Sequence, residues 1–203
     1  MSKILQSIYN VFSEKECNDL INVIKKLGFN KASLFTDVHG VEHYDTDIRN
    51  SMRKIIDNRD FAQLLEKRIY KYIPKTYNDL EYHSINYRFR FLKYEKGGFF
   101  ARHKDNNYKN KESMSLITIL IYLNDNYEGG YTTFFANVDD KKGFTLKPKT
   151  GMVSLMDQDI GHYVPELTEG IKYVIRTEIM YRGKSNSKQY INKEGPIKII
   201  KLN

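Results

Sequence analysis

A histidine and an aspartate one residue apart, His103 and Asp105, follow an aromatic-rich strand pattern in the segment RFRFLKYEKGGFFARHKDNNY. Side chains two positions apart in an extended chain project to the same face, so this pair can hold one metal ion together. A third ligand must come from elsewhere, and the remaining histidines are His39, His43, His83 and His162. We favour His162, because it follows a strand-like run and a turn-like Asp-Gln-Asp.

The ligand types in this set indicate a particular metal chemistry. Two histidines and one carboxylate on one face of an octahedral ion leave three positions open, as in non-haem Fe(II) oxygenases. Those positions admit a chelating cosubstrate and O₂. An isolated His-x-Asp pair is common, however, and from the spacing alone a hydrogen-bonded polar pair at a loop explains it more often than a metal does.

A rival cluster lies upstream in the segment DVHGVEH at 37–43, with two further aspartates after it. His39 and His43 would share one face of a helix, but a glycine and a valine lie between them and no apolar periodicity supports a helix. An exposed acidic loop therefore fits this segment better. The next segment, RNSMR at 49–53, fits either the rim of a site or a surface turn.

Helices and then strands must position these residues. A capping box at 13–16 precedes apolar residues at helical spacing up to Gly28, and a second helix is expected over 60–72. Residues 30–50 have no regular pattern. Short strands with turn signals between them are expected at 85–94, 115–123, 131–136, 152–156 and 172–181. Helices followed by many strands indicate an α+β fold containing a sandwich or barrel.

The amino-acid composition restricts the possible domain organisation, metal ligands and partners. The 203 residues suit one domain, and with 40% hydrophobic residues the chain can build a core. The single cysteine, Cys17, excludes an internal disulfide or a thiolate-rich metal site. We expect a cytoplasmic protein, because neither a secretory signal nor a membrane-spanning run is evident. The net charge of +8 is spread along the chain and favours an anionic ligand only weakly.

Three segments, in the expected order, resemble the 2-oxoglutarate- and Fe(II)-dependent dioxygenases of the prolyl 4-hydroxylase group: YEKGGFFARHKD, IYLNDNYEGGYTTFF and KPKTGMVSLMDQDIGHYVPELTEGIKYVIRTEIMYR. The resemblance implies a double-stranded β-helix, or distorted jelly roll, with His103, Asp105 and His162 as catalytic iron ligands. It also implies a single catalytic domain over 1–203, with a helical support region (1–84), a jelly-roll core (85–182) and a tail (183–203). The tail ends in IKIIKL, which could add one edge strand.

The same resemblance implies Fe(II), 2-oxoglutarate and O₂ as cofactors and cosubstrates, with ascorbate as an accessory reductant. The cation for the far carboxylate of 2-oxoglutarate follows the distal histidine by about ten positions in that group, which favours Lys172 here. Arg176, four residues on along the same expected strand, is the alternative partner or a ligand-proximal residue. Tyr122 would hydrogen-bond the same carboxylate, and Tyr94 would line its pocket or be an ordinary core tyrosine.

The resemblance also implies the reaction, which is hydroxylation of a prolyl residue in a protein or peptide beneath a mobile loop at 106–113. Two alternatives remain open. One is a 2-oxoglutarate oxygenase acting on another substrate such as nucleic acid, for which no base-flipping pocket or phosphate-binding stripe is evident. The other is a jelly-roll binding module without turnover. No membrane partner is expected, and the oligomeric state is not readable.

Overall fold

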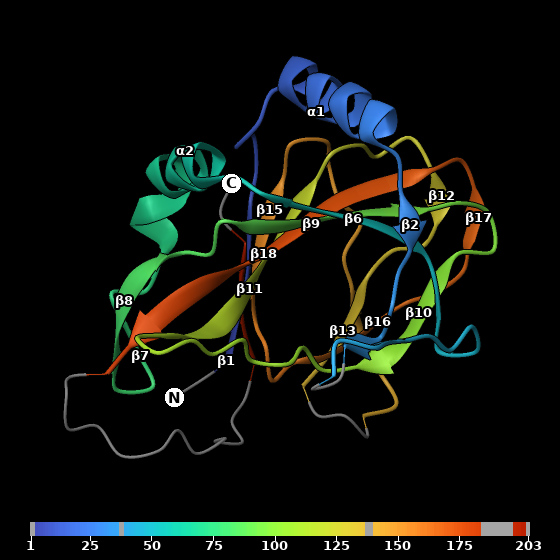
Figure 1. The fold of residues 1–203 in the computed structure, drawn as a ribbon. Coiled ribbons are helices and arrows are strands. Elements are labelled where there is room, and N and C mark those ends of the chain that lie inside the picture. The colour runs from blue at the N-terminus through green and yellow to red at the C-terminus, as the bar shows by residue number, and fades with distance from the viewer. Residues whose placement is uncertain (1–2, 37–38, 137–139, 184–196, 202–203) are drawn as a thin grey trace.

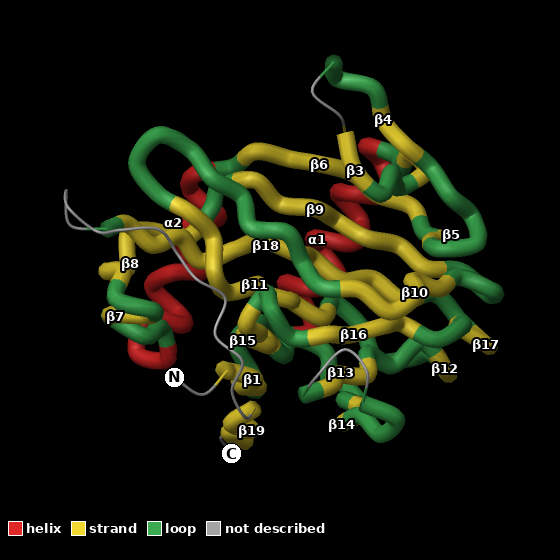
Figure 2. Tube along the Cα trace, turned by 90° about the horizontal axis from the view of Figure 1, so that it is seen from below, coloured by secondary structure: helices red, strands yellow, loops and turns green. Residues whose placement is uncertain are grey.

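Two facing β-sheets with helices on one side make up the fold in the computed structural model, which describes residues 3–36, 39–136, 140–183 and 197–201. In this described part, ten strands form a major sheet in the order β19-β1-β15-β11-β18-β9-β6-β2, with β8 also pairing β18 and β7 pairing β8. Five strands form a minor sheet in the order β14-β13-β16-β10-β5. The arrangement is a jelly roll, and Figure 2 shows the two sheets and the helices behind the major one.

The major sheet contains β1 (Lys3–Ile8), β2 (Asn30–Lys31), β6 (Met52–Asp57), β7 (Thr76–Tyr77), β8 (Leu80–Ile85), β9 (Arg88–Tyr94), β11 (Met114–Tyr122), β15 (Val153–Asp157), β18 (Lys172–Arg182) and β19 (Ile197–Lys201). The minor sheet contains β5 (Arg49–Asn50), β10 (Phe99–His103), β13 (Thr133–Phe135), β14 (Phe144–Thr145) and β16 (Gly161–Val164). Two small ribbons are β3 (Phe35–Thr36) with β4 (Glu42–His43), and β12 (Glu128–Gly129) with β17 (Leu167–Glu169).

Both predicted helices are confirmed. The helix α1 (Glu14–Leu27) begins at a complete capping box, in which the Ser13 hydroxyl accepts from the Glu16 backbone and the Glu16 carboxylate accepts from the Ser13 backbone. The helix α2 (Arg59–Ile69) is capped by the Asn58 side chain and continues into a 3₁₀ turn, η1 (Tyr70–Tyr72). No helix in the described part of the chain is long and apolar enough to cross a membrane.

Two apolar cores hold the layers together, one between the helices and the major sheet and one between the two sheets. The central strand β11 contributes to both, because alternate side chains of a strand point to opposite faces. Ile117, Ile119 and Ile121 belong to the helix-side core, whereas Leu120 and Tyr122 belong to the core between the sheets. The two faces of β11 therefore pack into different cores.

A close backbone approach fixes the end of β15 against the segment after β1. The Gly151 carbonyl accepts hydrogen bonds from the backbone of Val11 and Phe12, each at 3.1 Å. Gly151 has φ +77°, and a Cβ built there would lie 1.8 Å from the Phe12 carbonyl oxygen. A glycine is required at this position for both reasons.

The predicted strands at 85–94, 115–123, 131–136, 152–156 and 172–181 correspond to β8 with β9, β11, β13, β15 and β18. In addition to the two helices, the first 84 residues contribute β1, β2, β6, β7 and most of β8 to the major sheet. The expected edge strand in the tail is confirmed as β19, which pairs in parallel with β1, while residues 184–196 and 202–203 lie outside the described residues.

Candidate metal centre

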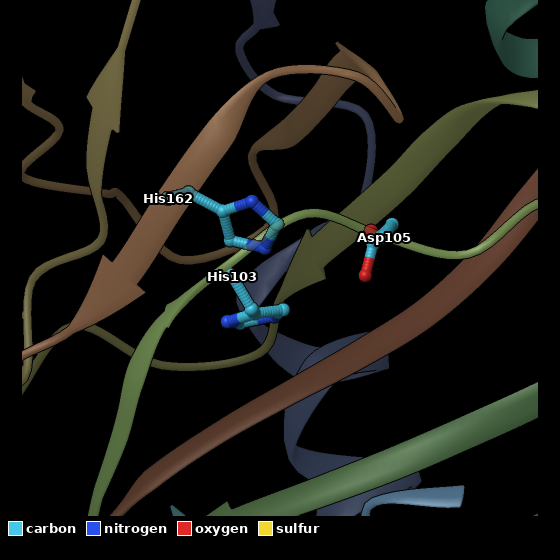
Figure 3. Close-up of side chains that lie close together, drawn as sticks. All are labelled: His103, Asp105 and His162. Carbon is cyan, nitrogen blue, oxygen red and sulfur yellow. The ribbon is translucent and has the colours of Figure 1, made fainter. Parts of the chain in front are cut away.

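The three predicted metal ligands lie close together in space (Figure 3). His103 ends β10 and faces His162 of β16 directly across the antiparallel pair, with ring centroids 4.2 Å apart. Asp105 follows β10 by two residues. Each residue offers a ligand atom, and these atoms lie within 4.8 Å of one another. One ion could therefore contact all three.

Hydrogen bonds fix the tautomer of both imidazoles. Nδ1 of His103 lies 2.8 Å from the Ala101 carbonyl oxygen, and Nδ1 of His162 lies 3.0 Å from that of Ile160. A carbonyl oxygen only accepts, so each Nδ1 carries the proton and each Nε2 offers a lone pair. Burial lowers the pKa of His103 to about 3 and also lowers the pKa of His162. Both rings are neutral near pH 7, as metal ligation requires.

Asp105 is held ionised inside the protein. Burial alone would raise its pKa, but Arg176 and the two imidazoles outweigh burial and lower it. The Arg176 guanidinium contacts both carboxylate oxygens at 3.2 Å, and the Thr118 hydroxyl donates to one of them at 2.5 Å. Arg176 also contacts Glu178 at 2.9 Å. Arg176 is therefore next to a proposed ligand and already has two carboxylate partners.

A cavity of about 600 Å³ opens beside the three ligands and is lined by residues of both sheets. Lys172 borders it and is 1% exposed. Its ammonium donates to the Gly130 carbonyl at 2.7 Å and lies 5.3 Å from the centre of the Tyr94 ring. Among the described residues no carboxylate pairs with it, and burial lowers its pKa to about 7. Lys172 is thus a buried cation without a counter-ion.

Of the two predicted tyrosines, Tyr94 lines the cavity and Tyr122 lies in the core between the sheets. Tyr94, on β9, lines the cavity and lies opposite Lys172 in the sheet register. Tyr122, on β11, is 1% exposed, and its buried hydroxyl makes no hydrogen bond within the described structure. Burial raises the pKa of Tyr122 to about 12. Tyr122 itself does not border the cavity, but its hydroxyl lies near Thr132, which does.

The segment 49–53 forms part of the cavity wall and is not a surface turn. Arg49 is 7% exposed and lines the cavity together with Arg53. The Arg49 guanidinium lies 4.5 Å from the centre of the Phe100 ring, whose other neighbour is the His103 ring at 3.6 Å. A two-residue strand is too short to show a periodic pattern. The only sequence signal for Arg49 was therefore the position of this segment upstream of the expected strands.

The rival cluster at 37–47 does not gather into a metal site within the described residues, although residues 37 and 38 lie outside them. His43, on β4, stacks on Phe35 with ring centroids 4.5 Å apart. In the loop at 106–113, Asn107 donates to the Ser115 carbonyl of β11 at 2.8 Å and to the side chain of Gln158, just after β15, at 2.9 Å. Asn106, Asn107 and Tyr108 border the cavity.

The donors present fit a non-haem Fe(II) and 2-oxoglutarate. Two neutral imidazole nitrogens and one carboxylate match the ligand set that leaves open positions on an octahedral ion. The Lys172 ammonium borders the cavity and has no carboxylate partner among the described residues, so it fits the far carboxylate of a dicarboxylic acid.

Comparisons with known proteins agree with this geometry. Residues 89–178 match the family model described as the 2OG-Fe(II) oxygenase superfamily. A viral collagen prolyl hydroxylase from Paramecium Bursaria Chlorella virus-1, in a 2OG complex, is similar at TM-score 0.64 and 18% identity, covering 87% of this chain and 95% of that one.

Two further structures are similar. A Pseudomonas putida prolyl-4-hydroxylase has TM-score 0.62 and 15% identity, covering 89% of this chain and 93% of that one. A Trichoplax adhaerens prolyl hydroxylase, in complex with a hypoxia inducible factor peptide fragment, has TM-score 0.67 and 17% identity, covering 86% and 82%. A search among curated protein sequences finds no match. The structural likeness establishes the jelly-roll fold.

Proposed function

We propose that residues 89–178, which match the 2OG-Fe(II) oxygenase superfamily model, form such an oxygenase domain, and that the protein is a dioxygenase that hydroxylates prolyl residues in a protein or peptide. The observation that carries the proposal is the convergence of three ligands and one unpaired buried ammonium on a single cavity. We further propose that residues 1–203 act as one catalytic unit, because β1 and β19 complete the edge of the major sheet.

We assign the iron to His103, Asp105 and His162, and the far carboxylate of 2-oxoglutarate to Lys172 with the Tyr122 hydroxyl. Lys172 is preferred over Arg176 because Arg176 already contacts Asp105 and Glu178. Arg176 then acts as a positioning residue, whose fork holds the Asp105 carboxylate in one orientation.

When bound, Fe(II), 2-oxoglutarate and O₂ together supply the oxidising power for inserting one oxygen atom into a C–H bond, with succinate and CO₂ as the other products. The residues of the protein bind the metal and the cosubstrate and orient the substrate. The Ala101 and Ile160 carbonyls hold the two imidazoles with Nε2 unprotonated. Apolar side chains in the cavity wall, including Leu92, Val164 and Val174, keep water away from the reacting carbon.

A protein or peptide substrate is supported by the open side of the cavity. Exposed apolar residues lie there, with Phe35 at 53% and Tyr108 at 43% exposure. Such a rim suits an extended segment whose proline enters the cavity. The similarity to the Trichoplax adhaerens enzyme, which is described with a peptide fragment, supports the same substrate class.

The test is a mass-spectrometric search for products of +16 Da after incubation with Fe(II), 2-oxoglutarate and a library of proline-containing peptides. We expect the added oxygen on proline, with succinate formed in equal amount. The His162→Ala protein is the control and should form neither product. Succinate formation without oxygen on any proline would overturn the prolyl assignment, and no succinate with any peptide or nucleic acid would favour a binding module.

A further inference from the structure

The cavity carries more positive charge than its carboxylates balance. Among the described residues, seven cationic side chains line it. Five of them, Arg53, Arg88, Arg90, Lys104 and Arg176, lie within 3.2 Å of a carboxylate oxygen. The other two, Lys172 and Arg49, have no carboxylate partner in the described part of the chain, and both are buried. The cavity therefore carries two buried basic side chains that the described carboxylates do not pair with, and an anionic ligand would complement them.

Arg49 is fixed in place by neutral groups. Its Nε donates to the Ser51 hydroxyl at 2.7 Å, and its guanidinium covers one face of Phe100, the residue directly opposite it across the β5–β10 pair. Burial lowers the pKa of Arg49, but an arginine stays charged at neutral pH. These contacts leave part of the guanidinium fork for a ligand in the cavity.

The two unpaired cations lie at different ends of Tyr94. The Lys172 ammonium is over the Tyr94 ring, whereas Arg49 and Ser51 interact with its hydroxyl. The charge of Lys172 contributes to lowering the pKa of His162, and the charge of Arg49 contributes to lowering the pKa of His103. In the proposed function the far carboxylate of 2-oxoglutarate takes Lys172. A cosubstrate held there leaves the Arg49 side of the cavity for the substrate.

Resting on that function, we propose that Arg49 binds a carboxylate of the substrate itself, so that the enzyme selects a proline accompanied by a negative charge. The planar fork of arginine matches a carboxylate with two parallel hydrogen bonds. Two sources can supply this group: the α-carboxylate of a terminal or free proline, or the side chain of an acidic residue beside the target proline.

The experiment measures binding without turnover. Wild-type protein loaded anaerobically with Fe(II) and 2-oxoglutarate is titrated calorimetrically with two matched pairs of probes. N-acetylproline against N-acetylprolinamide tests the α-carboxylate, and N-acetyl-Glu-Pro-amide against N-acetyl-Gln-Pro-amide tests the acidic side chain. We expect about tenfold or more tighter binding of the acidic member in at least one pair, which identifies the source.

The variants locate the effect. Arg49→Gln and Arg49→Lys should each reduce the preference, with a larger reduction for Gln, while the Kd for 2-oxoglutarate changes less than about threefold. Arg88→Gln is the matched control: Arg88 lines the cavity but is paired with Asp57 and half exposed, so its loss should leave the preference intact. The wild-type protein is also titrated with inorganic phosphate, which should bind more weakly than the acidic probe.

No preference for the acidic member of either pair would overturn the proposal. So would an Arg49→Gln protein that loses 2-oxoglutarate and keeps the preference. Failure of the proposed function is separate: acidic probes that bind at Arg49 without oxygen appearing on proline would leave this inference standing. Hydroxylation of neutral and acidic proline peptides with equal kcat/KM would support the proposed function and contradict the proposed role of Arg49.

Discussion

Replacing Lys172 with methionine should make the metal-free protein more stable at pH 6. Burial lowers the Lys172 pKa from 10.5 to about 7, with no carboxylate in the described structure to offset it. A shift of about 3.5 pH units corresponds to about 5 kcal/mol of destabilisation. Methionine has a similar length but loses the hydrogen bonds to Gly130 and Thr132, worth about 2 kcal/mol together. The net gain of about 3 kcal/mol should raise Tm by about 6 to 12 °C.

The stability difference between the wild type and the Lys172→Met protein should decrease as pH rises. Below pH 7 Lys172 is charged in the folded and unfolded protein, so its burial penalty is complete. Between pH 7 and 10.5 Lys172 binds more protons in the unfolded protein than in the folded protein, so its penalty falls as pH rises and the advantage of the methionine variant shrinks. The assay is thermal unfolding of both proteins from pH 6 to pH 10.

An exposed lysine provides the control for that series. Lys149 is 68% exposed, so Lys149→Met should change Tm by less than about 2 °C at every pH. Adding 2-oxoglutarate with Mn²⁺ should raise Tm of the wild type and much less that of the Lys172 variant. A Lys172→Met protein less stable than wild type at pH 6, or a difference that does not change with pH, would refute the reasoning.

Three further predictions concern other parts of the chain. His162→Ala removes a proposed ligand, and iron retained after gel filtration should fall at least about tenfold, whereas wild-type retention would contradict the assignment. Arg176→Met leaves Asp105 buried without its cation and should cost about 3 kcal/mol in urea unfolding; a loss below about 1 kcal/mol would show that the pair contributes little. Gly151→Ala should cost at least about 3 kcal/mol in the same assay, because its Cβ meets the Phe12 carbonyl. Gly97→Ala, at the same φ of +77° but with no atom within 4 Å, should cost only about 1 kcal/mol, and equal losses would exclude the close contact as the cause.

Features with a local pattern were predictable from the sequence. The capping box located α1, and the apolar run at 115–123 located β11. The pairing of His103 with Asp105 followed from the period of two in an extended chain. The third ligand, His162, rested on its place after a strand and on the resemblance, since 59 residues separate it from His103.

Features that depend on distant partners were not predictable. The strands β1 and β6 were missed because KILQSI and MRKIID do not alternate cleanly between apolar and polar residues. The role of Arg176 depends on β18 passing beside Asp105, which is 71 residues away in the chain. Burial of Arg49 depends on the two-residue strand β5 adding to the edge of the minor sheet. Such long-range placement leaves no local sequence signal.

The direct opposition of His103 and His162 across β10 and β16 has a consequence for folding. Neighbouring side chains on a strand alternate between faces, so a slip of one residue would turn one imidazole out of the cavity while most of the sheet remained intact. Iron capture can then proofread the alignment of these two strands. Molecules that assemble with the wrong alignment would lack one of the three proposed ligands and would bind the metal more weakly.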